Sequence, residues 1–329
     1  MPKILEILFR LIAVLALVGL LSAGAAAELT PAPEGSFSIV VLPDTQTYAA
    51  VKPEIFHAET QWIVDNLSRQ RIKFVSHVGD IVDRNVTAQW QVARDAMDRL
   101  HGVVPYGFSV GNHDMVTATG DCSLFQQFFP ASRFEQFAWY GGGYKNNSNS
   151  FQLFSAEGLD FVIVHLECNA PDDVLAWADR VLREHSARRA IVTTHMYLGP
   201  LHRPTTSQGW YDDPKGRMLW KKCHGPRGNT PEEMWQKCFS KHENLFLICC
   251  GDQSRTQAMR RAVEGTQGNT VYEVLSDYHE GSLRLCRFLP DEDLIEVWTY
   301  RPHEDELCSG TKIVPDPDEH HFTLPYDMP

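Results

Sequence analysis

Apolar runs of strand length recur along the chain from residue 36, and segments with apolar residues at helical spacing lie between them. Runs of about four to eight apolar residues bounded by turn residues are typical of buried strands. Expected strands cover 36–42, 72–78, 103–110, 150–155, 159–166, 190–194 and 245–250. Expected helices cover 53–69, 87–100, 121–129, 171–185 and a segment that starts at Thr230 with Pro231 in its first position.

The pattern changes in the second half of the chain. Residues 140–149 are rich in Gly and Asn and predict a flexible turn region, and residues 197–230 predict a long loop insertion over one face. A Pro- and acid-rich extension covers 301–329. A closing antiparallel set is expected from the runs 271–276, 282–289 and 294–300. Strands that alternate with helices and are followed by hairpins predict an α/β fold, with two mixed β-sheets packed as a sandwich and flanked by helices.

The first 27 residues differ from the rest. Lys3 and Arg10 form a basic region that precedes an unbroken apolar run over residues 11–21, and small residues follow the run. This order is typical of a cleavable secretory signal, and the run is shorter than the ~20 apolar residues that a membrane span needs. We therefore expect 1–27 to be a signal peptide and 28–329 to be one exported domain, secreted or periplasmic and without a membrane contact after cleavage. An uncleaved N-terminal anchor is the alternative.

The chain is acidic, with a formal net charge of −12. That charge argues against a broad nucleic-acid surface, which depends on Lys and Arg to neutralise phosphates. It is compatible with a small phosphorylated substrate whose charge is offset by bound metal ions. The apolar fraction of 43% is ordinary for a globular domain and provides a sizeable core.

All eight cysteines follow the expected signal, and an even number in an exported chain permits disulfides. Cys223 and Cys238 flank a loop-to-helix junction and could pair, but the sequence does not determine the pairing. No cysteine spacing is typical of a zinc site.

Five expected strands end in polar residues of a kind that binds hard metal ions or carries protons. These residues are Asp44, Asp80, Asn112, His195 and Asp252. In open α/β sheets, ligands bind beyond the carboxyl ends of the strands. Five independent strand ends with such residues therefore predict one site, and the combination indicates a two-metal phosphoester hydrolase.

The chemistry assigns roles to residues near the second and third of these strand ends. Two divalent cations screen an anionic phosphoryl group and lower the pKa of a water between them, and Asp80 is the natural bridging carboxylate. His113 is the candidate general acid for the leaving alkoxide. Asp83 could hold the His113 ring, and Arg84 offers a planar fork to phosphate oxygens.

The order Asp-x-Gln (44–46), Gly-Asp-x-x-Asp-Arg (79–84), Gly-Asn-His-Asp (111–114) and a strand-end His195 resembles the calcineurin-like metallophosphoesterases. The second motif is similar to that of the serine/threonine phosphatase branch. Asp-Thr-Gln and Ser-Asp-Tyr-His (276–279) resemble a secreted bacterial subgroup. The resemblance implies a first metal held by Asp44, Gln46 and Asp80, and a second metal held by Asp80, Asn112, His195 and Asp252, with His113 and Asp83 as the acid pair.

Two departures from the family pattern concern the metals. Gln46 stands where the family usually has His, and Asp252-Gln253-Ser254 stands where it usually has His-x-His. Fewer imidazoles and more oxygen donors favour Mn²⁺ or Mg²⁺, with Fe²⁺, Ca²⁺ and Zn²⁺ also possible. Glu167, Tyr278 and His279 are further candidates for the pocket wall, with structural roles as the alternative.

We therefore expect an exported metal-dependent phosphoester hydrolase in which a metal-bound hydroxide attacks phosphorus and His113 protonates the leaving oxygen. Monoesters are slightly favoured over diesters because Arg84 suits a terminal phosphate. The substrate would be a phosphorylated small molecule or a phosphoprotein. The competing hypothesis is a non-catalytic metal- or phosphate-binding protein of the same fold, with a degraded first metal site.

Overall fold

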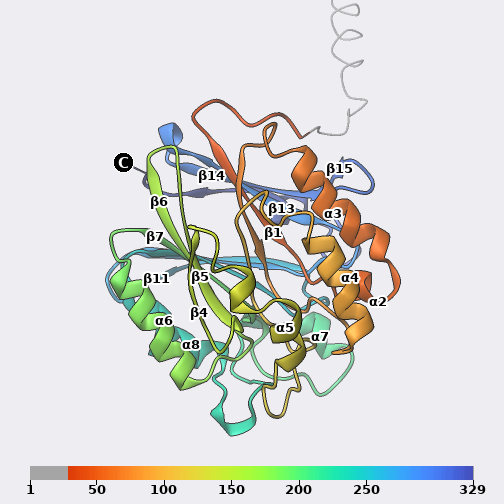
Figure 1. Ribbon diagram of the computed structural model, residues 1–329. Helices are drawn as coiled ribbons and strands as arrows, with labels where there is room; N and C mark the ends of the chain where they lie inside the picture. The colour runs from red at the N-terminus through yellow and green to blue at the C-terminus, as the bar shows by residue number, and fades with distance from the viewer. Residues whose placement is uncertain (1–28, 329) are drawn as a thin grey trace, which may run out of the picture.

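The computed structural model describes residues 29–328, which form two seven-stranded sheets packed face to face (Figure 1). The first sheet has the strand order β15 (Glu306–Leu307), β14 (Leu294–Arg301), β13 (Leu283–Leu289), β1 (Phe37–Leu42), β2 (Ile72–His77) and β3 (Tyr106–Phe108), with β16 (His321–Pro325) also paired to β14. The second sheet has the order β11 (Ala258–Glu264), β12 (Thr270–Ser276), β10 (Leu245–Gly251), β7 (Arg189–Met196), β6 (Leu159–His165), β5 (Asn149–Ala156) and β4 (Tyr140–Tyr144).

Apolar side chains from both sheets fill the space between them. Phe37 of β1 stacks on Phe288 of β13 with ring centroids 4.7 Å apart, and it meets Phe161 of β6 edge-on at 5.5 Å. All three rings are fully buried. Since Phe161 belongs to the second sheet, this aromatic cluster fixes the two layers against each other.

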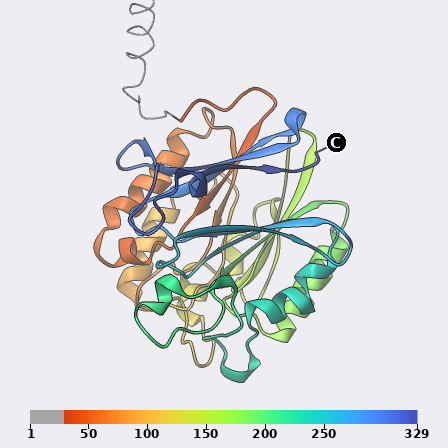
Figure 2. The ribbon, with the colours of Figure 1, turned by 180° about the vertical axis from the view of Figure 1, so that it is seen from behind.

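Helices cover the outer faces of the two sheets (Figures 1 and 2). On one side lie α2 (Gln46–Val51), α3 (Pro53–Asp65) and α4 (Thr87–Met97); on the other lie α6 (Asp172–Glu184) and α8 (Pro231–Lys237); α5 (Ser123–Phe128) and α7 (Gly209–Asp212) are shorter. Single 3₁₀ turns occur at η1 (Ala131–Arg133), η2 (Gly225–Arg227), η3 (Phe239–Lys241), η4 (Pro290–Glu292) and η5 (Pro317–Glu319). Within residues 29–328, no helix has both the length and the apolar character needed to cross a bilayer.

The expected fold class is confirmed, as is the start of α8. Thr230 Oγ1 accepts a hydrogen bond from the Glu233 amide at 3.2 Å, and the Glu233 carboxylate accepts one from the Thr230 amide at 2.7 Å. This reciprocal capping box satisfies two amides at the start of the helix. The expected signal peptide, residues 1–27, lies outside the described residues, which begin at Leu29.

Three local expectations were wrong. The Gly-rich segment 140–144 is strand β4, because an edge strand needs only backbone hydrogen bonds to β5. The segment 197–230 is not a plain loop, since it contains α7 and a hairpin of β8 (Leu198–Pro200) with β9 (Lys215–Arg217). The three closing runs do not form one set: β13 and β14 join the first sheet, whereas β12 runs parallel to β10 in the second.

Glu59 of α3 is fully buried, and neither of its carboxylate oxygens has a hydrogen-bond partner. Burial raises its pKa well above the ordinary value, so the folded state retains a proton that the unfolded state releases near its usual pKa. The free energy of unfolding of wild type therefore decreases as the pH rises above the ordinary pKa of Glu59 in the unfolded state. We expect Glu59→Gln to gain free energy of unfolding relative to wild type as the pH rises above the ordinary pKa of a glutamate, by about 1.4 kcal/mol per pH unit in which only the unfolded state ionises. Urea denaturation at several pH values measures this, and equal pH slopes in both proteins would contradict it.

Candidate active site

The carboxyl ends of strands from both sheets bring their polar residues to one edge of the molecule. Asp44, Asp80 and His195 each offer one ligand atom, and these atoms lie within 4.8 Å of one another. His195 Nε2 lies 3.0 Å from Asp80 Oδ1 and 3.7 Å from Asp252 Oδ1. The amide of Asp252 donates to Asp44 Oδ2 at 3.0 Å. Four of the predicted metal-ligating residues are thus brought together.

The backbone is adapted to this convergence. Ideal Cβ atoms at Gly111 and Gly251 would lie 2.1 Å from an Asp80 atom and from Asp44 Oδ1 respectively, so only glycine allows the approach. Asp80 and Asp252 themselves adopt the left-handed conformation, with φ of 47° and 77°. Strained non-glycine residues of this kind cluster at functional sites.

His195 is oriented for ligation. Its Nδ1 lies 2.9 Å from the carbonyl oxygen of Val78, so Nδ1–H donates to that carbonyl and Nε2 points toward the carboxylates. Burial alone would lower the pKa of His195, but the Asp80 and Asp44 carboxylates outweigh it and raise the pKa well above its usual value. Burial alone would raise the pKa of Asp80, but His195 and its hydrogen bonds lower it to about 2. The pair therefore favours a positive charge beside an ionised carboxylate.

Two buried ligand-type oxygens at this edge, Asp44 Oδ1 and Gln46 Oε1, have no hydrogen-bond partner. His195 Nε2 and Asp277 Oδ1 are buried beside them and contact Asp80, Asp252 and His279 as ion pairs. A buried polar atom without a partner costs roughly 1–3 kcal/mol. A divalent cation would satisfy such lone pairs together, so these residues fit a metal ion.

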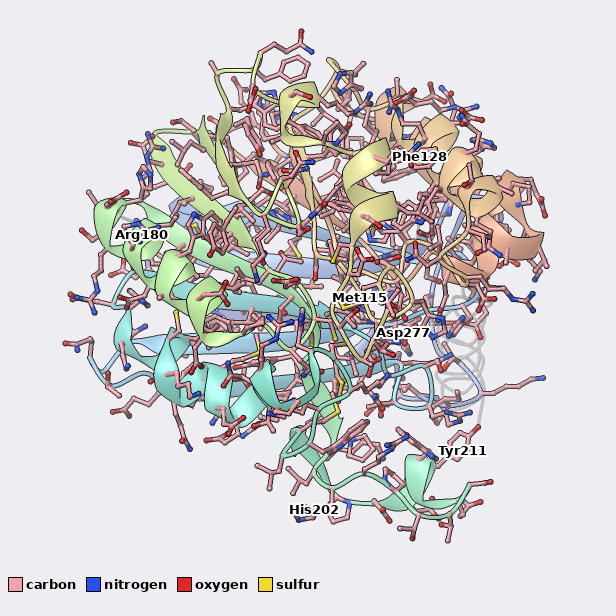
Figure 3. The ribbon with its side chains drawn as sticks, turned by 60° about the horizontal axis from the view of Figure 1, so that its bottom comes forward. Met115, Phe128, Arg180, His202, Tyr211 and Asp277 are labelled. Atoms are coloured by element: carbon pink, nitrogen blue, oxygen red, sulfur yellow. The ribbon has the colours of Figure 1, made fainter. Side chains whose placement is uncertain are left out.

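Asp277, which follows β12, is a site residue that the sequence analysis did not select. Asp277 is buried. Burial is the main cause that raises the pKa of Asp44, and the nearby Asp277 carboxylate is the second. Its own pKa is raised to about 6 by burial, with Asp252 and Asp80 adding to the shift and His279 opposing it. His279 Nε2 lies 3.4 Å from Asp277 Oδ1. Asp277, labelled in Figure 3, is therefore a fourth carboxylate whose charge acts on Asp44, Asp80 and Asp252.

A buried histidine on β2 supports the two loops that carry Asp44 and Asp80. His77 Nδ1 accepts a hydrogen bond from the Gly79 amide at 3.1 Å, so its Nε2–H donates to Thr45 Oγ1 at 3.0 Å. Thr45 Oγ1 in turn donates to the Ile81 carbonyl at 3.1 Å. These bonds fix both loops, as supporting residues of metal sites commonly do.

His113 lies at the rim, with 40% of its side chain exposed. Its amide donates to Asp80 Oδ1 at 2.9 Å, and its Nδ1 lies 2.7 Å from the backbone carbonyl of Asp83. The Asp83 carboxylate is farther, at 3.9 Å, so Asp83 orients the ring mainly through its backbone. Arg84 is highly exposed and lies 3.8 Å from the Asp83 carboxylate.

A lysine that the sequence analysis also missed contacts the predicted second metal position. Lys222 Nζ donates to Asn112 Oδ1 at 3.0 Å and forms an ion pair with Asp252 Oδ1. These are donor atoms that a second metal ion would use. Lys222 lies in the segment 197–230, where no local pattern distinguishes it from other lysines.

The model of the calcineurin-like phosphoesterase family matches residues 37–227. The chain belongs to the calcineurin-like phosphoesterase family. This confirms the predicted family, and the two-sheet architecture is the fold expected of it.

A similar curated protein is YvnB of Bacillus subtilis strain 168, described as uncharacterized, which is 31% identical over 316 residues. The match covers 92% of this phosphoesterase chain and 22% of the length of YvnB. Among solved structures, the purple acid phosphatase PPD1 of yellow lupin is 14% identical, with a TM-score of 0.54 over 92% of this chain and 56% of PPD1. A dimetal phosphatase of Danio rerio is 12% identical, with a TM-score of 0.46 over 81% of this chain and 95% of its own. PPD1 supports the fold alone.

Within this phosphoesterase fold, Asp277 is the carboxylate whose charge acts most strongly on Asp44. We expect Asp277→Asn to weaken binding of the first divalent ion by roughly 10- to 100-fold, because it removes a buried charge from the ligand cluster. Titration calorimetry with Mn²⁺ measures this, and Ser254→Ala serves as the matched control that should bind as wild type does. Equal affinity of Asp277→Asn and wild type would remove Asp277 from the metal site.

Two other features of the phosphoesterase lie outside this cluster. Cys223 Sγ lies 3.4 Å from Cys168 Sγ, whereas Cys238 Sγ faces His242 at 3.9 Å, so the structure places Cys168 and not Cys238 beside Cys223.

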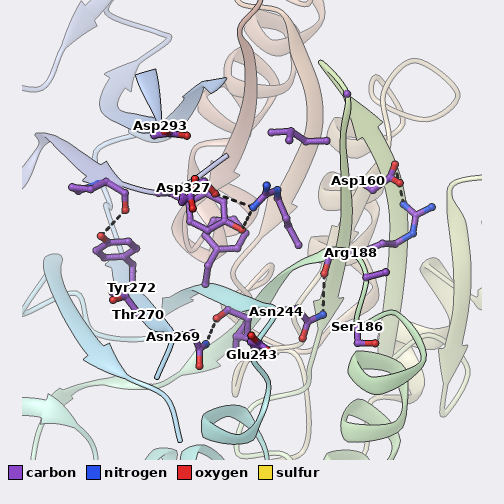
Figure 4. A pocket seen from close by; sticks show the side chains of 18 residues that line it. Asp160, Ser186, Arg188, Glu243, Asn244, Asn269, Thr270, Tyr272, Asp293 and Asp327 are labelled. Carbon is purple, nitrogen blue, oxygen red and sulfur yellow. Dashed lines mark hydrogen bonds and ion pairs between the residues drawn. The ribbon is translucent and has the colours of Figure 1, made fainter. Parts of the chain in front are cut away.

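A hollow of about 980 Å³ (Figure 4) is lined by residues at the starts of β6, β7, β10 and β12. It therefore lies at the opposite strand ends and takes no part in this site.

Proposed function

We propose that the chain is a metal-dependent hydrolase of phosphate esters, and that it acts at the carboxyl-end cluster. The observation that carries the proposal is the cluster of buried ligand-type atoms on Asp44, Gln46, His195 and Asp277, of which Asp44 Oδ1 and Gln46 Oε1 have no hydrogen-bond partner, set beside the rim imidazole of His113. A pure binding protein has no need of an imidazole at that position. Most of the donor atoms are oxygens, which favours Mn²⁺ or Mg²⁺. Such ions, when bound, would screen the phosphoryl charge and lower the pKa of a water.

The ligand sets follow from the positions of the side chains. A first ion would be held by Asp44, Gln46 and Asp80, with Asp277 added. A second cation position is bounded by Asp80, Asn112, His195 and Asp252. Asp80 is common to both positions, and the contacts of its Oδ1 with His195 Nε2 and the His113 amide fix its orientation.

His113 is proposed to hold and deliver the proton that the leaving oxygen takes up. Because its Nδ1–H is donated to the Asp83 carbonyl, Nε2 is the atom left to carry that proton. Nε2 lies 3.9 Å from Asp80 Oδ2, at the exposed edge of the cluster where a substrate can approach. Arg84 follows Asp83 in the loop after β2. It is proposed to contact the terminal phosphate, which favours monoesters over diesters.

The proposed substrate is a phosphorylated small molecule, with a phosphoprotein as a second class to be tested. The proposal of export rests on the residue pattern of positions 1–27. Secretion or residence in the periplasm would give the domain access to phosphate esters outside the cytoplasm.

The deciding experiment uses the chain from residue 28 to residue 329, stripped of metal by chelation. Hydrolysis of an aryl phosphate and of an aryl phosphodiester is then measured after separate addition of Mn²⁺, Mg²⁺, Ca²⁺, Zn²⁺ and Fe²⁺. We expect turnover to return with Mn²⁺ or Mg²⁺ and to be faster with the monoester. Tight ion binding without turnover of either ester under any condition would instead identify a non-catalytic metal-binding protein.

A further inference from the structure

The ammonium group of Lys222 lies among donors of the second cation position. It hydrogen-bonds Asn112 Oδ1 at 3.0 Å and forms an ion pair with Asp252 Oδ1, and both oxygens would otherwise be available to a metal ion. A cation is therefore already present where a second metal would bind.

The backbone around Lys222 is held in place from several sides. The Asn169 Oδ1 atom accepts hydrogen bonds from the amides of both Lys222 and Cys223, at 3.0 and 3.2 Å. Asn169 is fully buried and left-handed, with φ of 52°. The amide of His224 donates to the Thr117 carbonyl at 2.9 Å. Lys222 is thus presented by a fixed segment, which reduces the entropy lost when its ammonium binds.

The residue at position 252 explains why an ammonium is accepted. The family usually has an imidazole there, and an imidazole that ligates a metal is neutral and offers a cationic side chain no opposite charge. Asp252 supplies a carboxylate, which pairs with an ammonium and accepts its hydrogen bonds. The carboxylate at 252 and the lysine at 222 are therefore complementary to each other.

We propose that Lys222 acts as the second cation, so that the centre holds one tightly bound divalent ion together with the Lys222 ammonium. This inference deepens the proposed hydrolase function and rests on it. Because Lys222 is tethered beside the site, its ammonium is present there at an effective concentration in the millimolar range or above. A free divalent ion at lower concentration must compete with it for the Asn112 and Asp252 oxygens. The ammonium would also offset the charge of a bound phosphate, as lysines commonly do.

The test counts Mn²⁺ ions bound to the full exported domain. Wild type, Lys222→Met and Lys221→Met are titrated with Mn²⁺ and followed by calorimetry and by electron paramagnetic resonance, in which two neighbouring Mn²⁺ ions give a spin-coupled signal. Lys221 is the matched control, because its ammonium bonds the carbonyls of Pro226 and Gly228 and does not contact the site donors. Lys222→Gln is a second uncharged variant in case Lys222→Met does not fold.

We expect wild type and Lys221→Met to bind one tight Mn²⁺ with an uncoupled signal. Lys222→Met should bind a second Mn²⁺ roughly 10- to 100-fold more tightly than wild type does, with a coupled signal. Two tight, spin-coupled Mn²⁺ ions in wild type, or a second-ion affinity unchanged by removal of the lysine, would overturn the inference.

Turnover of an aryl phosphate, measured on the same samples, separates this inference from the proposed function. Hydrolysis by a wild-type protein that holds two coupled ions would leave the hydrolase function standing and remove the role of Lys222. If Lys222→Met binds an additional Mn²⁺ but no variant hydrolyses the ester, the role of Lys222 as the second cation would stand and the proposed hydrolase function would be contradicted.

Discussion

Asp80→Asn is expected to weaken binding of the first divalent ion by more than about 100-fold, beyond the loss typical of a residue that only supports a ligand, and to reduce turnover to background. The substitution keeps the shape of the side chain but removes the charge that both cation positions share. Asp80 Oδ1 contacts His195 Nε2 at 3.0 Å and accepts the His113 amide at 2.9 Å. One change therefore disturbs the metal, the imidazole ligand and the acid.

Mn²⁺ calorimetry and kcat/KM for an aryl phosphate measure this effect. The matched control is Asp160→Asn, the same substitution at a largely exposed aspartate of β6. Circular dichroism checks that both variants fold. Wild-type turnover by folded Asp80→Asn would show that the chemistry lies elsewhere in the molecule.

His113→Ala is expected to lower kcat by roughly 10²–10⁴-fold for an alkyl phosphate, which needs a proton on its leaving oxygen. The loss should be much smaller for a nitrophenyl phosphate, whose phenolate leaves without help. Because the His113 side chain lies at the rim and is not assigned as a metal ligand, the affinity for Mn²⁺ should stay close to that of wild type.

Parallel kinetics with the two esters, and with His202→Ala as a control on an exposed loop residue, test this assignment. An equal loss with both leaving groups would assign His113 to substrate positioning. No loss with either ester would remove it from the reaction.

Much of the site was predictable because its residues stand at the ends of recognisable strands. Asp44, Asp80 and Asp252 each follow a short apolar run. The strands before Asp44 and Asp80 are parallel neighbours in the first sheet, so their ends must share an edge, and β10 of the second sheet ends at that same edge. The structure brings these three together with His195 and Asn112. The ligand roles of these residues stay predictions.

Asp277 and Lys222 were not predicted, for two different physical reasons. The strand before Asp277 was expected, but it was assigned to a closing antiparallel set, whereas β12 pairs parallel to β10 and so carries Asp277 to the site. Lys222 depends on the tertiary course of a long connection. Its position comes from the buried amide oxygen of Asn169, more than fifty residues earlier.

The proposed ligands come from both layers of the sandwich. Asp44 and Asp80 follow strands of the first sheet, and His195 and Asp252 belong to or follow strands of the second. The first ion, held by Asp44 and Asp80 after strands of the first sheet and by Asp277 after β12 of the second, would cross-link the two layers, and separation of the layers would release it. Since a ligand present at 100 times its Kd adds about 2.7 kcal/mol to the free energy of unfolding, the metal supply would set how long this domain survives heat and proteases as well as how fast it works.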